Sequence, residues 1–249
     1  HKAIRRQRQM CIRDREKVIW RFDPLIITPN IAPRDLLMRI WHIGNKLKGY
    51  TNKLVFSFVD VKAYRKVQNN LVKETMLFTK ENVENAEANL AQRIEIVEGL
   101  QKIREVWHKD GWDVEIATCA EDIDLEKYGI EHNRCIDGDL ITRLAWKDKK
   151  LMDFMKIKVE DVPSPSLFGK PELPNGAILL PNNHYFISKH KKDAGQRQFC
   201  QCMAAKDIGE YNTCPHLCEY CYANTSKEIA IGNWKKHQNR PYAETITGK

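Results

Sequence analysis

The sequence predicts an α/β fold, a partial (β/α) barrel of parallel strands. The first observation is the order strand, helix, strand, helix, strand, which is typical of parallel strands joined by crossover helices. The second is that the three strand segments Lys17–Phe22, Leu54–Val59 and Val114–Thr118 are rich in apolar residues, as in strands buried on both faces. The third is size: 249 residues with 42% hydrophobic residues are enough for one sizeable core.

The segments between these strands carry helix signals. Pro24 lacks a ladder donor and is expected to end the first strand. Pro33 suits a first helical turn, apolar residues then recur at helical spacing, and Gly49 is expected to end that helix. Residues 61–78 predict a loop with some helix.

A long apolar stripe predicts the longest helix of the chain. Thr79 is a suitable N-cap, apolar residues recur from Val83 to Trp107, and Gly111 follows. We interpret this stripe as core and not as a cofactor site.

The later part of the chain is more varied. A short helix is expected over Gly138–Trp146 and another over Ser226–Lys236. Residues 151–190 contain five of the ten prolines and predict an irregular insertion, with a hairpin formed by Ala177–Leu180 and Tyr185–Ile187.

The positive charge is concentrated at the start. The net charge is +8, of which residues 1–15 carry +5 and the remainder +3. The chain begins with His1, and the run Gln9–Arg15 looks like a translated sequencing adapter, so we expect residues 1–15 to be a non-native or disordered arm. Residues 16–249 are then a single barrel-like domain, truncated at its N-terminus. A basic surface can bind nucleic acid, but here that interpretation has weak support.

Cysteine usage favours a metal site. Five of the eight cysteines lie within Cys200–Cys221, and the sequence has no secretory-leader pattern and no apolar run of about 18 residues. Clustered cysteines without such a leader are typical of a reduced, metal-binding protein of the cytoplasm, with no membrane partner.

The cluster loop spans residues 198–224. Cys214, Cys218 and Cys221 have the spacing Cys-x3-Cys-x2-Cys, and three thiolates so close can hold three irons of a [4Fe–4S] cluster. Cys200 and Cys202 are possible additional ligands. Two alternatives stay open: a closed zinc site that combines Cys200 and Cys202 with loop cysteines, and a ferredoxin-type carrier with one of these two as the fourth ligand.

The loop, with Tyr220 directly before its last cysteine, resembles the cluster loop of radical S-adenosylmethionine enzymes. The wider sequence resembles an uncharacterised bacterial family, a domain of unknown function with such a cysteine cluster near its C-terminus. The blocks that carry this resemblance are Trp20–Thr28, Leu54–Asp60, Ile116–Ile141 and Lys192–Asn224.

The resemblance implies a cofactor but no known reaction. S-adenosylmethionine would bind the iron without a protein ligand, Tyr220 and Asn224 would line the cofactor side, and a donor such as flavodoxin or ferredoxin would supply the electron. The substrate is unknown. Radical enzymes usually carry this loop after their first barrel strand, so its position near the C-terminus implies a circularly permuted barrel. The alternative function is a non-enzymatic module stabilised by zinc or a cluster, with nucleic acid as a partner.

Polar residues follow each predicted strand. In barrels of strand–helix units the active site forms at the carboxyl ends of the strands. Arg21 is a candidate to clamp a carboxylate or phosphate, and Asp23 to hold a ribose or an amine, both on the cofactor side. The remaining candidates for a substrate pocket are Ser57, Asp60, Thr118 and Glu121. Each of these residues also suits an ordinary turn or helix cap.

Overall fold

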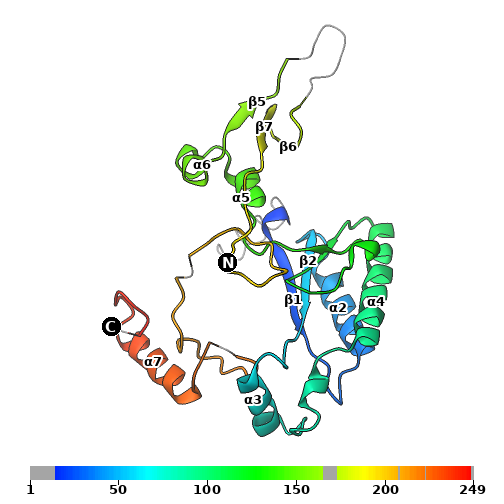
Figure 1. The fold of residues 1–249 in the computed structure, drawn as a ribbon, viewed down its shortest axis with the longest axis vertical. Helices are drawn as coiled ribbons and strands as arrows, with labels where there is room; N and C mark the ends of the chain where they lie inside the picture. Colours follow the sequence, from blue (N-terminus) through cyan, green and yellow to red (C-terminus); the bar gives the residue numbers. More distant parts are fainter. Residues whose placement is uncertain (1–14, 165–172, 207, 222, 248–249) are drawn as a thin grey trace. The chain divides into compact units, whose positions relative to one another are not determined.

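A computed structural model describes the chain as two compact units (Figure 1). The described residues are 15–164, 173–206, 208–221 and 223–247. Nearly all of the predicted N-terminal arm, residues 1–14, therefore lies outside them. The first unit comprises residues up to 117, residues 123–131 and residues from 206 onward, and the second comprises 118–122 and 132–205.

The structure is a mixed α/β fold with a four-stranded parallel sheet in the order β1-β2-β3-β4. In chain order the first unit contains η1 (Arg15–Lys17), β1 (Ile19–Leu25), α2 (Pro33–Leu47), β2 (Lys53–Phe58), α3 (Arg65–Thr75), η2 (Val83–Ala86), α4 (Leu90–Lys109), η3 (Glu126–Tyr128) and α7 (Lys227–Asn239). Strands β3 (Glu115–Thr118) and β4 (Glu131–His132) lie where the chain passes between the units. The three predicted strands are therefore confirmed.

Strand β1 is longer than predicted. It pairs with β2 in parallel, with Ile19 opposite Lys53, and it continues past Pro24 to Leu25. The prediction that Pro24 ends this strand is wrong. The register between β1 and β2 shifts between Phe22 and Leu25, and the strand continues past Pro24 through this irregular stretch. An irregularity in an edge strand tolerates a residue without an N–H donor.

Helices α2 and α4 lie next to each other beside the sheet (Figure 1). A cluster of tryptophan side chains belongs to the core that they share with the sheet. Trp107 of α4 is fully buried, stacks on Trp41 with ring centroids 5.9 Å apart, and donates from Nε1 to the Asn45 side chain at 2.9 Å. Gly44 of α2 makes this possible, because a Cβ there would lie 2.3 Å from the Trp107 ring. The stripe that ends at Trp107 is core, as predicted.

Helix α4 begins later than predicted. Asn89, and not Thr79, is its N-cap: the Asn89 side chain accepts from the Gln92 N–H at 3.0 Å, and the Gln92 side chain accepts from the Asn89 N–H at 2.9 Å. The apolar residues before this point belong to η2, where Val83 is buried in a different cluster. Two elements therefore share what looks like one stripe in the sequence.

That second cluster lies beyond the carboxyl end of β2, around α3 and η2. Its buried members are Val59, Val61, Val67, Leu71, Phe78, Val83 and Ala86, and Tyr220 of the cysteine loop packs against them. An apolar cluster at this position provides a surface that can hold the loop close to the ends of β1 and β2.

The second unit contains α5 (Gly138–Ala145), α6 (Lys149–Met155) and an antiparallel sheet of β5 (Val159–Asp161), β7 (His184–Ile187) and β6 (Ala177–Leu180). The predicted hairpin is confirmed, with Ala177 opposite Ile187. Residues 151–190, expected to be irregular, thus contribute three strands, and residues 165–172 lie outside the described part. The predicted helices at α5 and α7 are confirmed as well.

Within the described ranges, no helix is both long enough and apolar enough to cross a membrane.

Candidate metal centre

Three predicted polar residues meet on β1 and β2. Arg21 lies near the middle of β1, and Asp23 and Ser57 lie near the carboxyl ends of their strands. The Asp23 carboxylate accepts from Arg21 Nε at 3.1 Å, and it also accepts from Arg21 Nη2 and from the Ser57 hydroxyl. The side chain of Asp23 is only 18% exposed and that of Arg21 39%. Neighbouring parallel strands end at the same sheet edge, which explains why residues 36 positions apart in the sequence share this group. Arg21 is thus paired with Asp23 and helps to hold that carboxylate in place.

The cysteine loop is closed at its base by hydrogen bonds. The Asn212 N–H donates to the Ala223 carbonyl at 3.1 Å, and the Asn212 side-chain oxygen accepts from the backbone N–H and hydroxyl of Thr225. Asn224, which is buried, donates from Nδ2 to the Cys214 carbonyl at 2.8 Å. Its Oδ1 atom is buried without a hydrogen-bond partner. These contacts fix the two ends of the loop and leave a buried acceptor inside it.

The three loop cysteines are free thiols. Cys214 and Cys218 are exposed and Cys221 is half-buried. The Cys221 N–H donates to the Cys218 carbonyl at 3.0 Å, and Leu217 has a positive φ of 56°, so the backbone turns sharply between the first and second cysteines. Among the residues that the structure describes, no group of three or more His, Cys, Asp or Glu side chains is arranged to hold a metal ion. The donor set suits a metal, but its thiols are not gathered.

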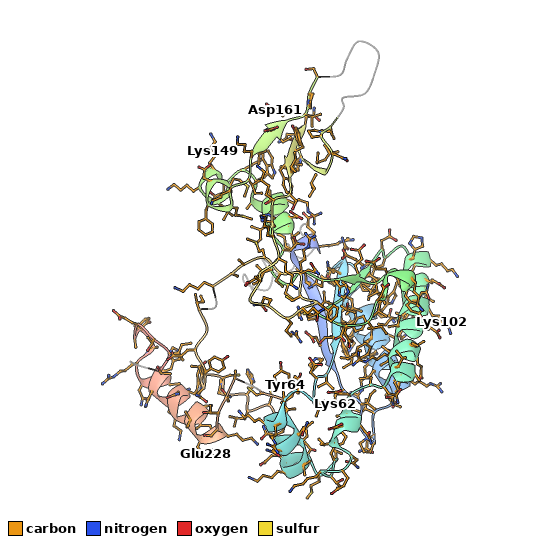
Figure 2. The ribbon with its side chains drawn as sticks, in the orientation of Figure 1. Lys62, Tyr64, Lys102, Lys149, Asp161 and Glu228 are labelled. Carbon is orange, nitrogen blue, oxygen red and sulfur yellow. The ribbon has the colours of Figure 1, made fainter. Side chains whose placement is uncertain are left out.

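Tyr220 fastens this loop to the strand ends. The half-buried Tyr220 side chain packs on the second cluster and forms a hydrogen bond with the backbone of Asp60. Burial raises the pKa of Tyr220, and the charges of Asp60 and Asp23 add to the rise, whereas the hydrogen bond with the Asp60 backbone opposes it. Tyr64, at the start of α3 (Figure 2), also contributes to the rise. The loop tyrosine thus lies close to Asp23 and Asp60.

Helix α3 holds the loop from a second side. Asn70 donates from Nδ2 to the Glu219 carbonyl at 3.1 Å. Lys227, the first residue of α7, lies 2.6 Å from a Glu219 carboxylate oxygen and 3.4 Å from one of Glu74. The hydrogen bond to Glu219 raises the pKa of Lys227. Sequence reasoning missed Asn70, Glu74 and Lys227, because nothing in their spacing shows that α3 meets the loop.

The other predicted residues belong to the second unit. Thr118 and Glu121 are buried there, and the Thr118 carbonyl accepts from the Asn133 N–H at 2.6 Å. Cys200 and Cys202 are buried in the same unit. Burial raises the pKa of the Cys202 thiol, and the N–H donors of Ile136 and Cys135 oppose this rise. The residues that the structure brings together in the first unit are therefore Arg21, Asp23, Ser57, Asp60 and Tyr220.

The α/β fold and the cysteine loop together define a class of protein with a candidate metal-binding loop beside its sheet. A family model described as "Domain of unknown function (DUF1848)" matches residues 2–223. The chain therefore belongs to this family, and the match includes the three loop cysteines. Comparison with curated proteins and with solved structures found no match.

Proposed function

We propose that Cys214, Cys218 and Cys221 hold a [4Fe–4S] cluster and that the chain is an enzyme of the radical S-adenosylmethionine class. The observation that carries the proposal is the position of the loop: three unpaired thiols lie in a closed loop whose Tyr220 hydrogen-bonds to the backbone of Asp60, just beyond the carboxyl end of β2. Three thiolates leave one iron of a cubane cluster for a further ligand. When bound, the cluster supplies an electron to S-adenosylmethionine.

The loop has the chemistry for this cluster, but metal binding must complete its geometry. Metal sites are rarely preformed, and binding energy gathers the ligands. The hydrogen bonds of Asn212 and Asn224 hold the loop ends, while the exposed Cys214 and Cys218 thiols are free to turn toward Cys221. The gathering therefore requires side-chain rotation and a local change between Asn212 and Asn224.

The residues beside the loop suit the polar parts of S-adenosylmethionine. Asp23 offers a carboxylate, fixed by Arg21 and Ser57, to a ribose hydroxyl or an amine. Asn224 offers its unpartnered Oδ1 to a hydrogen-bond donor of the ligand. The ring of Tyr220 closes the apolar side of the loop. On this proposal Arg21 positions Asp23 and does not bind the ligand.

We also propose that the parallel sheet is part of a circularly permuted, partial (β/α) barrel. A circularly permuted, partial (β/α) barrel brings a C-terminal cysteine loop to the carboxyl ends of its strands, because a closed barrel has no privileged first strand. The contact of Tyr220 with Asp60, directly beyond β2, agrees with this arrangement.

Anaerobic reconstitution tests the proposal. We expect a brown protein with about four irons and four sulfides per chain, and formation of 5′-deoxyadenosine when the reduced protein receives S-adenosylmethionine. The triple variant Cys214→Ala, Cys218→Ala, Cys221→Ala should bind no iron and form no deoxyadenosine. If the wild-type loop binds zinc and no iron, and the triple variant loses that zinc, the result would support the non-enzymatic module instead.

A further inference from the structure

The four described cysteines other than Cys214, Cys218 and Cys221 lie together in the second unit. They come from three separate segments of the chain: Cys119 follows β3, Cys135 precedes α5, and Cys200 and Cys202 lie beyond β7. Their association is not a consequence of sequence proximity, because 16 residues separate the first pair and 67 separate Cys135 from Cys202.

Hydrogen bonds connect the four cysteines in a chain, through their thiols in two links and through the Cys135 backbone N–H in the third. The Sγ atoms of Cys119 and Cys135 are 3.3 Å apart. Cys202 Sγ accepts from the Cys135 N–H at 3.2 Å and from the Ile136 N–H at 3.4 Å, and the Cys202 thiol hydrogen-bonds with the Cys200 side chain. None of these four described cysteines forms a disulfide.

The distances suit thiolates that share a metal. A tetrahedral zinc with Zn–S bonds of about 2.3 Å places its sulfurs about 3.8 Å apart, whereas a disulfide requires about 2.05 Å. The Cys119–Cys135 separation of 3.3 Å is closer to the tetrahedral edge. In the described ranges no three ligating side chains already converge on a metal position, so zinc binding must turn these side chains inward.

The backbone around the thiols is already fixed. The Met203 N–H donates to the Ile136 carbonyl at 3.1 Å, and the Asp193 N–H donates to the Cys202 carbonyl at 2.9 Å. Asn133 donates from Nδ2 to Cys135 Sγ at 3.4 Å. N–H donors to sulfur stabilise a thiolate and orient it, as the hydrogen bonds around metal ligands generally do. Side-chain rotation on this backbone would then bring the four sulfurs toward a shared metal.

We propose that Cys119, Cys135, Cys200 and Cys202 bind one Zn²⁺ as a closed structural site. Four protein thiolates leave no position for water or substrate, which is the arrangement of structural and not of catalytic zinc. Soft thiolate ligands select zinc over the hard divalent cations. Binding replaces the four thiol protons with one Zn²⁺ and ties the three segments together. Cys200 and Cys202 are thereby assigned to this site and not to the cluster loop.

The test is metal analysis of the full chain, purified aerobically and without chelator. We expect about one zinc per chain in the wild type and in the triple variant of the loop cysteines. Cys135→Ser, at an exposed position, should weaken zinc binding more than roughly tenfold, since changes to groups around metal ligands alone cost 10–100-fold. Co²⁺ in place of zinc should give the intense visible bands of a tetrahedral thiolate site.

Thiol counting keeps the test valid if a variant does not fold. In the folded triple loop variant, a strong chelator should make four more thiols reactive and release one zinc. Zinc that disappears with the loop cysteines, iron at these four cysteines, or a disulfide between Cys119 and Cys135 in place of metal would each overturn the proposal. The triple variant also distinguishes this proposal from the proposed iron–sulfur cluster. Zinc can be retained when no cluster forms in the wild type, and a cluster can form in the wild type when no zinc is bound.

Discussion

The described cysteines form two groups whose surroundings differ. In the loop group, Cys214 and Cys218 are exposed and Cys221 is half-buried, and no disulfide pairs any of these three residues. In the other group Cys200 and Cys202 are buried, and Cys202 Sγ accepts two backbone N–H bonds. Three accessible thiols suit a metal with a vacant corner, whereas four hydrogen-bonded thiols suit a closed site. If both proposals hold, the loop group binds a reactive metal and the other group binds a structural one.

The largest effect on metal content is expected from replacing a single cysteine, in one group or in the other, with serine. Cys218→Ser should abolish deoxyadenosine formation, because two thiolates do not hold a cubane cluster, and it should leave zinc unchanged. Cys202→Ser should remove zinc and lower the melting temperature, since it opens a buried site. Iron, zinc and thermal unfolding measured on both variants check this. Loss of both metals in both variants would indicate that the two cysteine groups do not form two independent sites.

A smaller effect is expected at the strand ends. Asp23→Ala leaves the donors of Arg21 and Ser57 without their shared acceptor, and it removes the proposed ligand contact. We expect kcat/KM for S-adenosylmethionine to fall about tenfold to hundredfold, which corresponds to about 1.4–2.8 kcal/mol. Asp113→Ala, which also removes an acid paired with a basic side chain, His108, but lies 83% exposed, is the matched control. Equal losses in both variants would show that Asp23 acts through stability alone.

Removal of the Tyr220 hydroxyl should weaken the attachment of the cysteine loop. Tyr220→Phe keeps the packing on the second cluster and removes the bond with the Asp60 backbone, at a cost of about 0.5–1.5 kcal/mol. Hydrogen-exchange protection of residues 212–221 should therefore fall roughly two- to tenfold. Tyr211→Phe, at a tyrosine that is 61% exposed, should change nothing. Unchanged protection in Tyr220→Phe would mean that the loop is held elsewhere.

The smallest effect is a dependence on alkaline pH. The pKa values of Tyr220 and Lys227 are both raised in the fold, the first mainly by burial and the second mainly by its hydrogen bond to Glu219. A raised pKa favours the protonated group in the fold, so this contribution is complete below the unfolded values of about 10 and is lost as pH rises above them. Ultraviolet titration of the wild type minus Tyr220→Phe should give a midpoint above about 10. A midpoint at or below that value would contradict burial of the phenol.

Part of the site follows from the sequence. Arg21, Asp23 and Ser57 meet because β1 and β2 are parallel neighbours, and strand order with apolar composition predicts that. The Cys-x3-Cys-x2-Cys spacing identifies the loop for the same reason: local spacing sets local geometry. Features that depend on adjacent elements were therefore within reach of sequence reasoning.

Contacts between segments that are distant in the sequence could not be predicted from it. The packing of Tyr220 beside Asp60 depends on the apolar cluster around α3, and a hydrophobic contact carries no sequence signature of its partner. The same limit concealed the contact between Cys135 and Cys202, because local spacing groups Cys202 with the loop cysteines. The shift of the α4 start from Thr79 to Asn89 has a related origin, since η2 buries its apolar residues in a different cluster.

The most direct measurement is the electron paramagnetic resonance spectrum of the reduced, reconstituted chain with and without S-adenosylmethionine. A cluster held by three cysteines has one iron that can take the added molecule as a ligand, so the signal should shift on addition and vanish entirely in Cys218→Ser. A signal that is identical with and without S-adenosylmethionine, or that requires Cys200 or Cys202, would contradict an open three-cysteine cluster that is separate from a four-cysteine zinc site.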